Sequence, residues 1–218
     1  MKILFCAYRE WALSIYAGLD AIFTSQNHIL DKVITSEDLD LRARSENWDV
    51  IILVGWSWKV PADIVNNKLV IGMHPSNLPH YSGGSPIQNQ ILDGIEDTCA
   101  TLFKLNEQFD EGEIIDKEPI DLRGHLDDVL KNIASASTNL ILRFVEKFPN
   151  NQYAKQPKIV KTRLKRLKPD NSQLPSLNGM TCKEMWDFIR CREDPYPNAY
   201  FHDQTGTLTI KRVEFTPK

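Results

Sequence analysis

The sequence has no apolar run close to the ~20 residues that a membrane-spanning helix requires. It also lacks an excess of one charge, since 26 basic residues stand against 29 acidic ones and the net charge is −3. With 42% hydrophobic residues, this balance excludes a globally disordered chain. The first apolar run, residues 1–7, is too short for the core of a signal peptide and is typical of a buried strand. We therefore expect a globular cytoplasmic protein that binds no membrane.

Cysteine is scarce and is spaced too widely for a metal site. The four cysteines, Cys6, Cys99, Cys182 and Cys191, include no CxxC pair. Isolated thiols are typical of proteins from a reducing compartment. We interpret all four as small buried hydrophobic residues and expect no bound metal.

The first half of the sequence alternates short apolar runs with helix-length segments. Strands are predicted at residues 3–7, 32–35, 50–54 and 69–73, and helices at 11–23 and 38–48, with a short helix opened by Pro61. Residues 50–54 are continuously apolar, which is typical of a strand covered on both faces. The β-α-β-α-β order predicts an α/β fold with a mostly parallel sheet.

A loop follows the last of these strands. Three prolines and two glycines within residues 74–86 exclude regular structure there. We expect Ser85 to cap the next helix, with Pro86 in its first position and Gly94 near its end. Further strands are predicted at residues 100–105 and from 114, with a turn at 106–112, and a long amphipathic helix at 126–148.

The composition changes near Pro149, so we divide the chain into a core of residues 1–150 and a small α+β extension of residues 151–218 packed on it. A capping box at Thr181 and Glu184 predicts a helix in the extension, and residues 207–215 alternate like a strand with a bulge. The basic run, residues 155–168, has seven Lys and Arg and no acid. We interpret it as a solvated strand or linker that crosses back over an acidic domain, with RNA binding as the alternative.

His74 and Asp110 are the residues most suited to proton transfer. His74 directly follows a predicted buried strand, and Asp110 lies in the turn after another. Ligands of open α/β sheets bind at the carboxyl ends of strands, so the fold can bring the two together. The carboxylate would then fix the tautomer of the ring and raise its basicity. A histidine hydrogen-bonded into a turn beside a loop-capping aspartate is the structural alternative.

The motif around these residues has a family resemblance. Residues 70–94 (VIGMHPSNLPHYSGGSPIQNQILDG), Thr101-Leu102 and residues 109–115 (FDEGEII) resemble the formyltransferases that use 10-formyltetrahydrofolate, a family with methionyl-tRNA, glycinamide ribonucleotide and sugar N-formyltransferase members. The resemblance is densest over residues 51–115 and weaker at 195–201. It implies a Rossmann-like formyltransferase core, with His74 and Asp110 catalytic and Trp58, Lys59, Val60, Phe109 and Asp110 at the cofactor, 10-formyltetrahydrofolate.

Two positions depart from the family pattern. Gly72 stands where the family usually has an asparagine that helps to hold the formyl oxygen as it becomes an oxyanion, and Ser82 stands where many relatives have arginine. Losing such an oxyanion donor can cost ~10²–10³ in rate. We expect a water, backbone N–H groups with His74, or an amide to replace it, beside the gap that a glycine leaves. The candidate amides are Asn77, Gln88 and Asn89.

The acceptor is inferred by exclusion within the resemblance. The tRNA enzymes have a further C-terminal domain, the formyltetrahydrofolate hydrolases have an N-terminal regulatory domain, and the glycinamide ribonucleotide enzymes have a glycine-rich loop after the first strand, where this sequence has residues 7–11 (AYREW). A nucleotide-linked aminodeoxyhexose, with a UDP- or dTDP-4-amino sugar for surface glycans as the example, is therefore expected. Arg9 would pair with its pyrophosphate, Gly83 and Gly84 would allow the sugar to approach, and Tyr81 would stack on it. The remaining expected substrate residues are Tyr8, Pro75, Ser76, Asn77 and Gln88.

The sequence also allows other roles for some of these residues and other functions for the protein. Arg9 can instead pair with Glu10 or Glu37 at the surface, and Trp56 and Trp58 can pack under the sheet edge rather than line a pocket. The protein can be a formyltransferase for a tRNA-linked or peptide amine, or a folate- or nucleotide-binding protein without transfer activity. A homodimer is possible, and no nucleic acid partner is expected.

Overall fold

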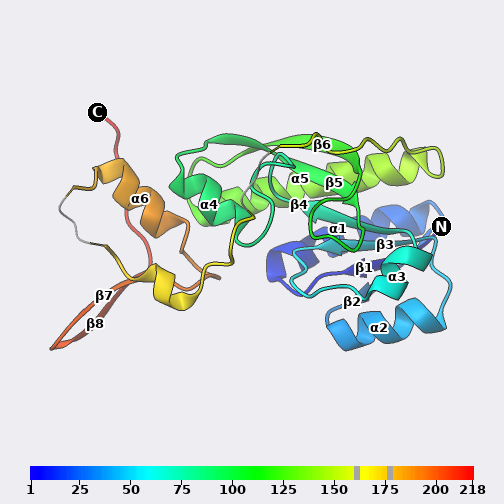
Figure 1. Cartoon of the computed structure of the whole chain (residues 1–218), viewed down its shortest axis with the longest axis horizontal. Helices are drawn as coiled ribbons and strands as arrows, with labels where there is room; N and C mark the ends of the chain where they lie inside the picture. The colour runs from blue at the N-terminus through cyan, green and yellow to red at the C-terminus, as the bar shows by residue number, and fades with distance from the viewer. Residues whose placement is uncertain (160–162, 176–178) are drawn as a thin grey trace.

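The computed structural model describes residues 1–159, 163–175 and 179–218 and is built around a six-stranded sheet in the order β2-β1-β3-β4-β5-β6 (Figure 1). The strands β1 to β4 pair in parallel, whereas β5 is antiparallel to β4 and β6 to β5. The predicted α/β fold with a mostly parallel sheet is therefore confirmed. The strands are β1 (Lys2–Cys6), β2 (Ile29–Val33), β3 (Val50–Val54), β4 (Val70–His74), β5 (Asp97–Lys104) and β6 (Ile114–Asp121).

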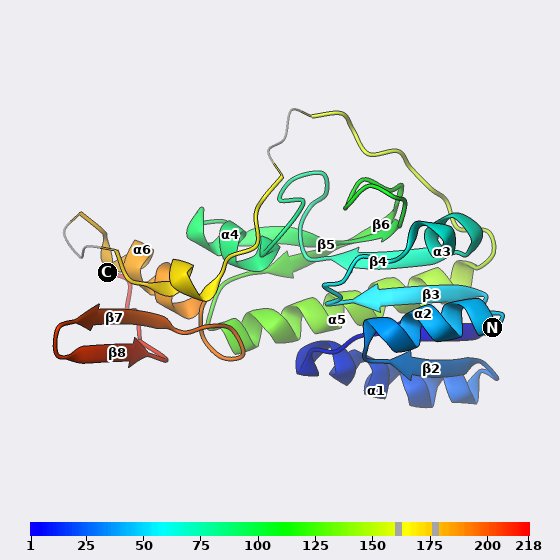
Figure 2. The ribbon, with the colours of Figure 1, turned by 60° about the horizontal axis from the view of Figure 1, so that its bottom comes forward.

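Helices cover both faces of this sheet (Figure 2). Helices α1 (Glu10–Ser25) and α5 (Leu126–Lys147) share one hydrophobic cluster with the strands. Helices α2 (Ser36–Ser45) and α3 (Ala62–Asn67) share the other. Strands β3 and β4 are buried along their whole length between these layers, which agrees with the continuously apolar sequence of β3. Helix α4 (Pro86–Leu92) follows the loop after β4. No helix in the described ranges is long and apolar enough to cross a bilayer.

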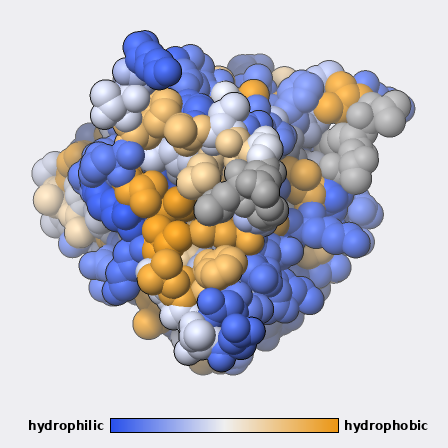
Figure 3. All heavy atoms as spheres, turned by 90° about the vertical axis from the view of Figure 1, so that its left-hand side faces the viewer, coloured by the Kyte–Doolittle hydropathy of each residue, from blue (hydrophilic) through white to orange (hydrophobic). Residues whose placement is uncertain are grey.

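The C-terminal residues form a small extension at one end of the sheet, on the left in Figure 1. It contains a short 3-10 helix, η1 (Pro169–Ser172), helix α6 (Cys182–Arg190) and a hairpin of β7 (Ala199–Asp203) and β8 (Gly206–Ile210) around its own apolar cluster. Apolar side chains also gather on the outer face of this end of the molecule (Figure 3). Thr181 and Glu184 form the predicted capping box.

Buried charged side chains attach the extension to the core. The Arg190 guanidinium, only 1% exposed, donates to the carbonyls of Leu122 and Gly124 and pairs with Asp187. The Glu193 carboxylate accepts hydrogen bonds from His125 and from the first backbone N–H of α5. Breaking a buried ion pair by removing one partner costs about 3–5 kcal/mol, so these contacts fix the extension against the core.

Three local predictions were only partly right. Ser85 occupies the N-cap of α4, but its φ of 50° is left-handed, and its Oγ accepts a hydrogen bond from Leu167 N–H instead of capping the helix. The strand expected over residues 207–215 ends at Ile210, so there is no bulge in it, and Leu208 is exposed. Cys6 and Cys191 are buried, but Cys182 is exposed on the first turn of α6 and Cys99 is partly exposed.

Candidate functional site

A cavity of about 860 Å³ opens where the chain leaves β1, β3 and β4. Strand β1 is followed by β2 on one side and has β3 on its other side, so the strand order reverses there. Open α/β sheets bind ligands at such a reversal, beyond the carboxyl ends of the strands. The lining includes Arg9 after β1, residues 55–60 after β3 and His74 at the end of β4. A volume of this size accommodates a cofactor-sized molecule.

His74 and Asp110 meet in the wall of this cavity. Nδ1 of His74 lies 3.7 Å from Oδ1 of Asp110, and its Nε2 lies 2.9 Å from the carbonyl oxygen of Tyr81. The His–Asp separation is within ion-pair range but longer than a hydrogen bond. Both ring nitrogens therefore face acceptor oxygens. A neutral ring can donate at only one of these two nitrogens, so which acceptor it bonds depends on its tautomer.

Asp110 reaches His74 by an indirect path. Strand β5 is antiparallel, and Thr101 rather than the last residue, Lys104, pairs with His74, so the following loop has to run back. Two contacts hold this loop: Gly83 N–H donates to Asp110 Oδ2 at 2.7 Å, and Gln156 Nε2 donates to the Asp110 carbonyl at 2.8 Å. Asp110 has a φ of 57°, a left-handed conformation that non-glycine residues adopt at a cost.

The residues expected at the cofactor lie together. Trp58, Lys59, Val60 and Phe109 all line the cavity. Phe109 is 44% exposed, and the Arg163 guanidinium lies 4.1 Å from its ring centroid. Trp56 also lines the cavity and packs edge-on against Trp58, at 4.9 Å between centroids. The deeper wall is apolar and consists of Leu53, Val65, Phe103 and Leu105.

The space beside Gly72 is filled. A Cβ built on Gly72 would lie 2.7 Å from Leu105 Cδ1 and 3.1 Å from the Phe103 ring, so the expected gap for a water or an amide is absent. Of the candidate amides, Asn77 accepts from Lys117, and Asn89 donates to the carbonyls of residues 84 and 85.

Gln88 is the candidate amide that faces the cavity. It is 4% exposed, and its Nε2 has no hydrogen bond of ordinary geometry within the described chain. The amide is nevertheless close enough to Tyr196 to oppose the rise in the pKa of that phenol, which burial causes. A contact that only perturbs a titration does not satisfy the N–H group, so Nε2 stays available to a ligand in the cavity.

The residues expected at the substrate divide into two groups. Arg9, Pro75, Gly83, Gly84 and Gln88 line the cavity. The other four belong to the surrounding framework and are not among the described lining residues. Tyr8 bonds Ser57, Ser76 donates to the His80 carbonyl, Asn77 accepts from Lys117, and Tyr81 donates to Asp93.

Tyr81 contributes its backbone rather than its ring. Its hydroxyl bonds Asp93 at 2.9 Å, and burial with this bond raises its pKa to about 12. The stacking role expected for its ring is therefore not supported. Its carbonyl, presented by a φ of 54°, faces His74 instead.

Gly83 and Gly84 make room for another part of the chain. A Cβ on Gly83 would lie 2.4 Å from the Leu164 oxygen, and one on Gly84 would lie 2.3 Å from the Arg166 nitrogen. The crossover segment, residues 163–168, occupies the space that we expected the sugar to use. Figure 2 shows it beside the loop that follows β4.

Sequence reasoning missed several cavity residues. Arg163, Lys165, Arg166 and Lys168 belong to the basic run, and Tyr196 to the stretch of weak resemblance. The acid-free composition of the run was the available signal. Lys161, also in the run, lies outside the described residues. In the part of the chain that is described, no cluster of three or more His, Cys, Asp or Glu side chains is arranged to hold a metal ion.

Fold and site together define an α/β protein with a histidine–aspartate pair in a cationic, cofactor-sized cavity. A family model described as formyl transferase matches residues 21–145, more than half of the chain, and the chain belongs to that family. A methionyl-tRNA formyltransferase of Ehrlichia canis is 31% identical over 138 residues, 59% of this chain and 45% of that protein. The chain thus spans about half the length of the curated relatives it matches.

Solved structures share the fold at lower identity. A methionyl-tRNA formyltransferase from Clostridium thermocellum has a TM-score of 0.87 at 24% identity, covering 99% of this chain and 94% of its own. A 4-N formyltransferase from Francisella tularensis has a TM-score of 0.77 at 20% identity, covering 98% of each chain. HypX from Aquifex aeolicus, in complex with tetrahydrofolic acid, has a TM-score of 0.77 at 18% identity and covers 92% of this chain and 36% of its own.

Proposed function

We propose that the protein transfers a formyl group from 10-formyltetrahydrofolate to the amino group of a nucleotide-linked aminodeoxyhexose. Membership of the formyl transferase family supports the transfer chemistry. The observation that carries the proposal is the pairing of His74 with Asp110 in the wall of a cavity lined by both aromatic rings and cationic side chains. The rings suit a flat aromatic cofactor, and the cations suit an anionic acceptor.

The aromatic side chains of the lining fit the folate. Trp58 and Phe109 expose ring surface, and the apolar wall behind them suits a buried heterocycle. Lys59 and Arg163 lie on the Phe109 ring and can face the carboxylates of the cofactor. The bound cofactor would supply the formyl group. A neighbour of the same fold was solved with tetrahydrofolic acid, which supports this choice.

His74 would stabilise negative charge as it develops on the formyl oxygen. Nε2 of His74 faces the Tyr81 carbonyl in this structure and would instead donate to the formyl oxygen, while Asp110 faces Nδ1 and orients the ring. Catalytic hydrogen bonds are often long in ligand-free structures, so a 3.7 Å separation is compatible with a pair that tightens on binding. Gln88 Nε2 would donate to the same oxygen in place of the family asparagine, because Gly72 has no room for a side chain.

A methionyl-tRNA acceptor is the second candidate. The curated relatives named above are methionyl-tRNA formyltransferases, and they extend well beyond the part that this chain matches. The neighbour from Francisella tularensis, in contrast, is named a 4-N formyltransferase and matches this chain over 98% of its own length. The solved methionyl-tRNA formyltransferase from Clostridium thermocellum is also matched over 94% of its own length, so the length of the match does not separate the two acceptors. The cationic side chains gathered in one cavity favour a small anionic acceptor, such as a nucleotide-linked amino sugar.

The test is a pair of transfer assays. The purified protein is incubated with 10-formyltetrahydrofolate and either UDP- and dTDP-linked 4-amino sugars or methionyl-tRNA, and a mass increase of one formyl group is measured by mass spectrometry. His74→Asn serves as the inactive control. Formylation of the tRNA but not of any sugar would replace the proposed acceptor, and transfer to neither would refute the proposal.

A further inference from the structure

The crossover segment, residues 163–168, is built into the candidate site by backbone contacts. Leu164 N–H donates to the Ser82 carbonyl at 3.0 Å, and its carbonyl accepts from Gly84 N–H at 2.8 Å. Leu167 N–H then donates to Ser85 Oγ at 3.0 Å. Gly83 and Gly84 have no Cβ, so the segment can lie directly on their loop. The same loop holds Asp110 through the Gly83 N–H.

This docking places positive charge in the cavity. Within the described ranges, six cationic and two acidic side chains line it. Both acids have partners elsewhere, since Asp110 faces His74 and Glu107 accepts from Asn66. The cationic side chains are Arg9, Lys59, Arg163, Lys165, Arg166 and Lys168.

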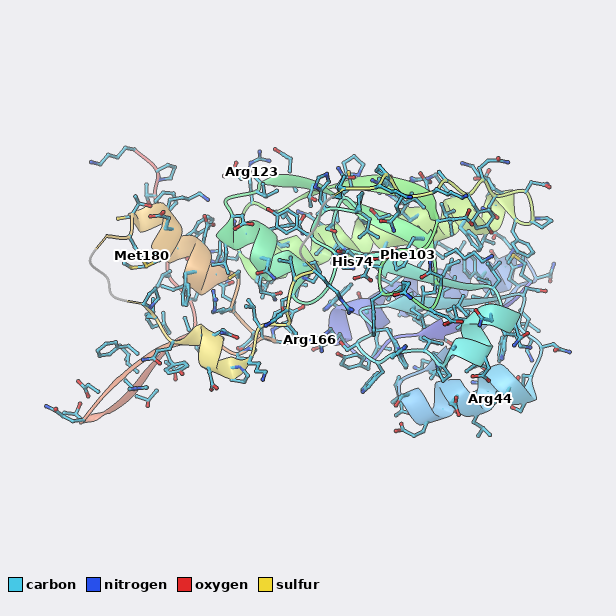
Figure 4. All side chains as sticks on the ribbon, viewed as in Figure 1. Arg44, His74, Phe103, Arg123, Arg166 and Met180 are labelled. Carbon is cyan, nitrogen blue, oxygen red and sulfur yellow. The ribbon has the colours of Figure 1, made fainter. Side chains whose placement is uncertain are left out.

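Arg9 and Arg166 both line the cavity beside the same tyrosine, Tyr196. Arg9 lies 5.1 Å from the Tyr196 ring centroid, and both arginines oppose the effect of burial on the pKa of the Tyr196 phenol. Neither guanidinium has a carboxylate partner among the residues described, and they come from opposite ends of the chain. Figure 4 shows Arg166 at the junction of the extension and the core.

We propose that Arg9 and Arg166 together bind the diphosphate of a nucleoside diphosphate, with Tyr196 beside it, and that the crossover segment exists to bring Arg166 there. Guanidinium groups bind phosphate oxygens bidentately, and two of them match the two phosphates. This inference deepens the proposed function and rests on it for the identity of the acceptor. The binding itself can be measured without any turnover.

An RNA backbone is the rival source of phosphate. An extended polyanion is usually held by cations spread along an exposed surface, and each contact adds to the salt dependence. Here Arg163, Lys165, Arg166 and Lys168, although exposed, all line one cavity, whereas Lys155 and Lys158 of the same run lie outside it. A small diphosphate therefore fits the arrangement better.

Isothermal titration calorimetry with UDP, dTDP and inorganic pyrophosphate tests the site in the full chain. Arg9→Ala and Arg166→Ala should each weaken nucleotide binding by about 10- to 100-fold, the value of a charge-assisted hydrogen bond. Lys158→Ala, in the same run but outside the cavity, should change it less than about 2-fold, as expected for a screened surface charge. Arg166 is exposed, so its replacement should leave the thermal unfolding temperature unchanged.

A backbone variant separates the segment from its side chain. Gly84→Ala places a Cβ 2.3 Å from the Arg166 nitrogen, so the crossover segment must move. Nucleotide affinity should then fall although Arg166 is intact. Unchanged UDP affinity in Arg166→Ala would overturn the inference. It would also be overturned if Arg166→Ala and Lys158→Ala lost affinity equally and the protein bound RNA with a steep salt dependence. Arg166-dependent UDP binding without formyl transfer would refute the proposed function alone.

Discussion

Replacing Gly72 by the asparagine that is usual in the family should impair this protein. The new Cβ would lie 2.7 Å from Leu105 Cδ1, whereas ordinary contact begins near 3.4 Å, so Leu105 must withdraw by about 0.7 Å. The Phe103 ring, at 3.1 and 3.2 Å, leaves little space on the other side. Overpacking of this kind costs about 1–3 kcal/mol. The amide would also enter beside His74, two residues away on the same strand face.

Three variants separate the steric effect from the chemical one. Gly72→Ala adds the Cβ alone and should cost less stability than Gly72→Asn in urea unfolding. Leu105→Ala combined with Gly72→Asn should recover part of the stability, because it removes the contacting methyl group. Turnover of Gly72→Asn should fall below that of the parent in the formyl-transfer assay. A stable Gly72→Asn protein with clearly higher turnover would refute the reasoning and indicate that the site is an impaired form of the family's.

The remaining predictions concern the proposed chemistry and the pH dependence of stability. His74→Asn and Asp110→Asn should each lower turnover at least ~10²-fold in steady-state kinetics with little change in nucleotide affinity, and a raised KM alone would make them binding residues. Gln88→Ala should lower single-turnover formyl transfer by ~10²–10³ if Nε2 holds the oxyanion, and an unchanged rate would contradict this role. Asp31 has a pKa lowered mainly by its hydrogen bond to Arg42, so its stabilisation is present above the ordinary carboxyl pKa and is lost as the pH falls through the lowered value. Asp31→Asn should therefore cost under about 1 kcal/mol at pH 7 in urea unfolding, and this cost should shrink as the pH falls through the lowered pKa of Asp31; a difference that does not shrink in acid would exclude this cause.

Helices and strands that a continuous local sequence pattern specifies were predicted closely. The continuously apolar residues 50–54 are β3, and the helix expected over 126–148 is α5 at Leu126–Lys147. Strand β2 was misplaced by a few residues, since it lies at Ile29–Val33 rather than 32–35. It is an edge strand with mostly exposed or half-buried residues, so the apolar signal that marks the central strands is weak there.

The candidate site could be predicted only where its residues follow the sequence motif. His74, Asp110 and the residues expected at the cofactor line one cavity. His74 ends β4 and residues 58–60 follow β3 closely, whereas Asp110 arrives on a loop that runs back from the end of β5. The hydrogen bond of Ser85 could not be predicted, because its Oγ accepts from the backbone N–H of Leu167, eighty-two residues along the chain. The use of Gly83 was misjudged for the same reason, since a glycine signals a close approach but not what approaches.

The charge of the chain shows why the crossover segment matters for binding. A net charge of −3 hides an uneven division, because the basic run has seven cations and the rest of the chain has 19 basic and 29 acidic residues. If the basic run were not docked, the acidic residues of the rest of the chain would offset its positive charge. Docked on Gly83 and Gly84, it instead directs Arg163 and Arg166 into the cavity. A cavity lined mainly by positive charge on an otherwise acidic protein attracts anions to one place and repels them elsewhere. The docking glycines and the basic run therefore act together, because the glycines let the run add four cations to the two, Arg9 and Lys59, that line the cavity without it.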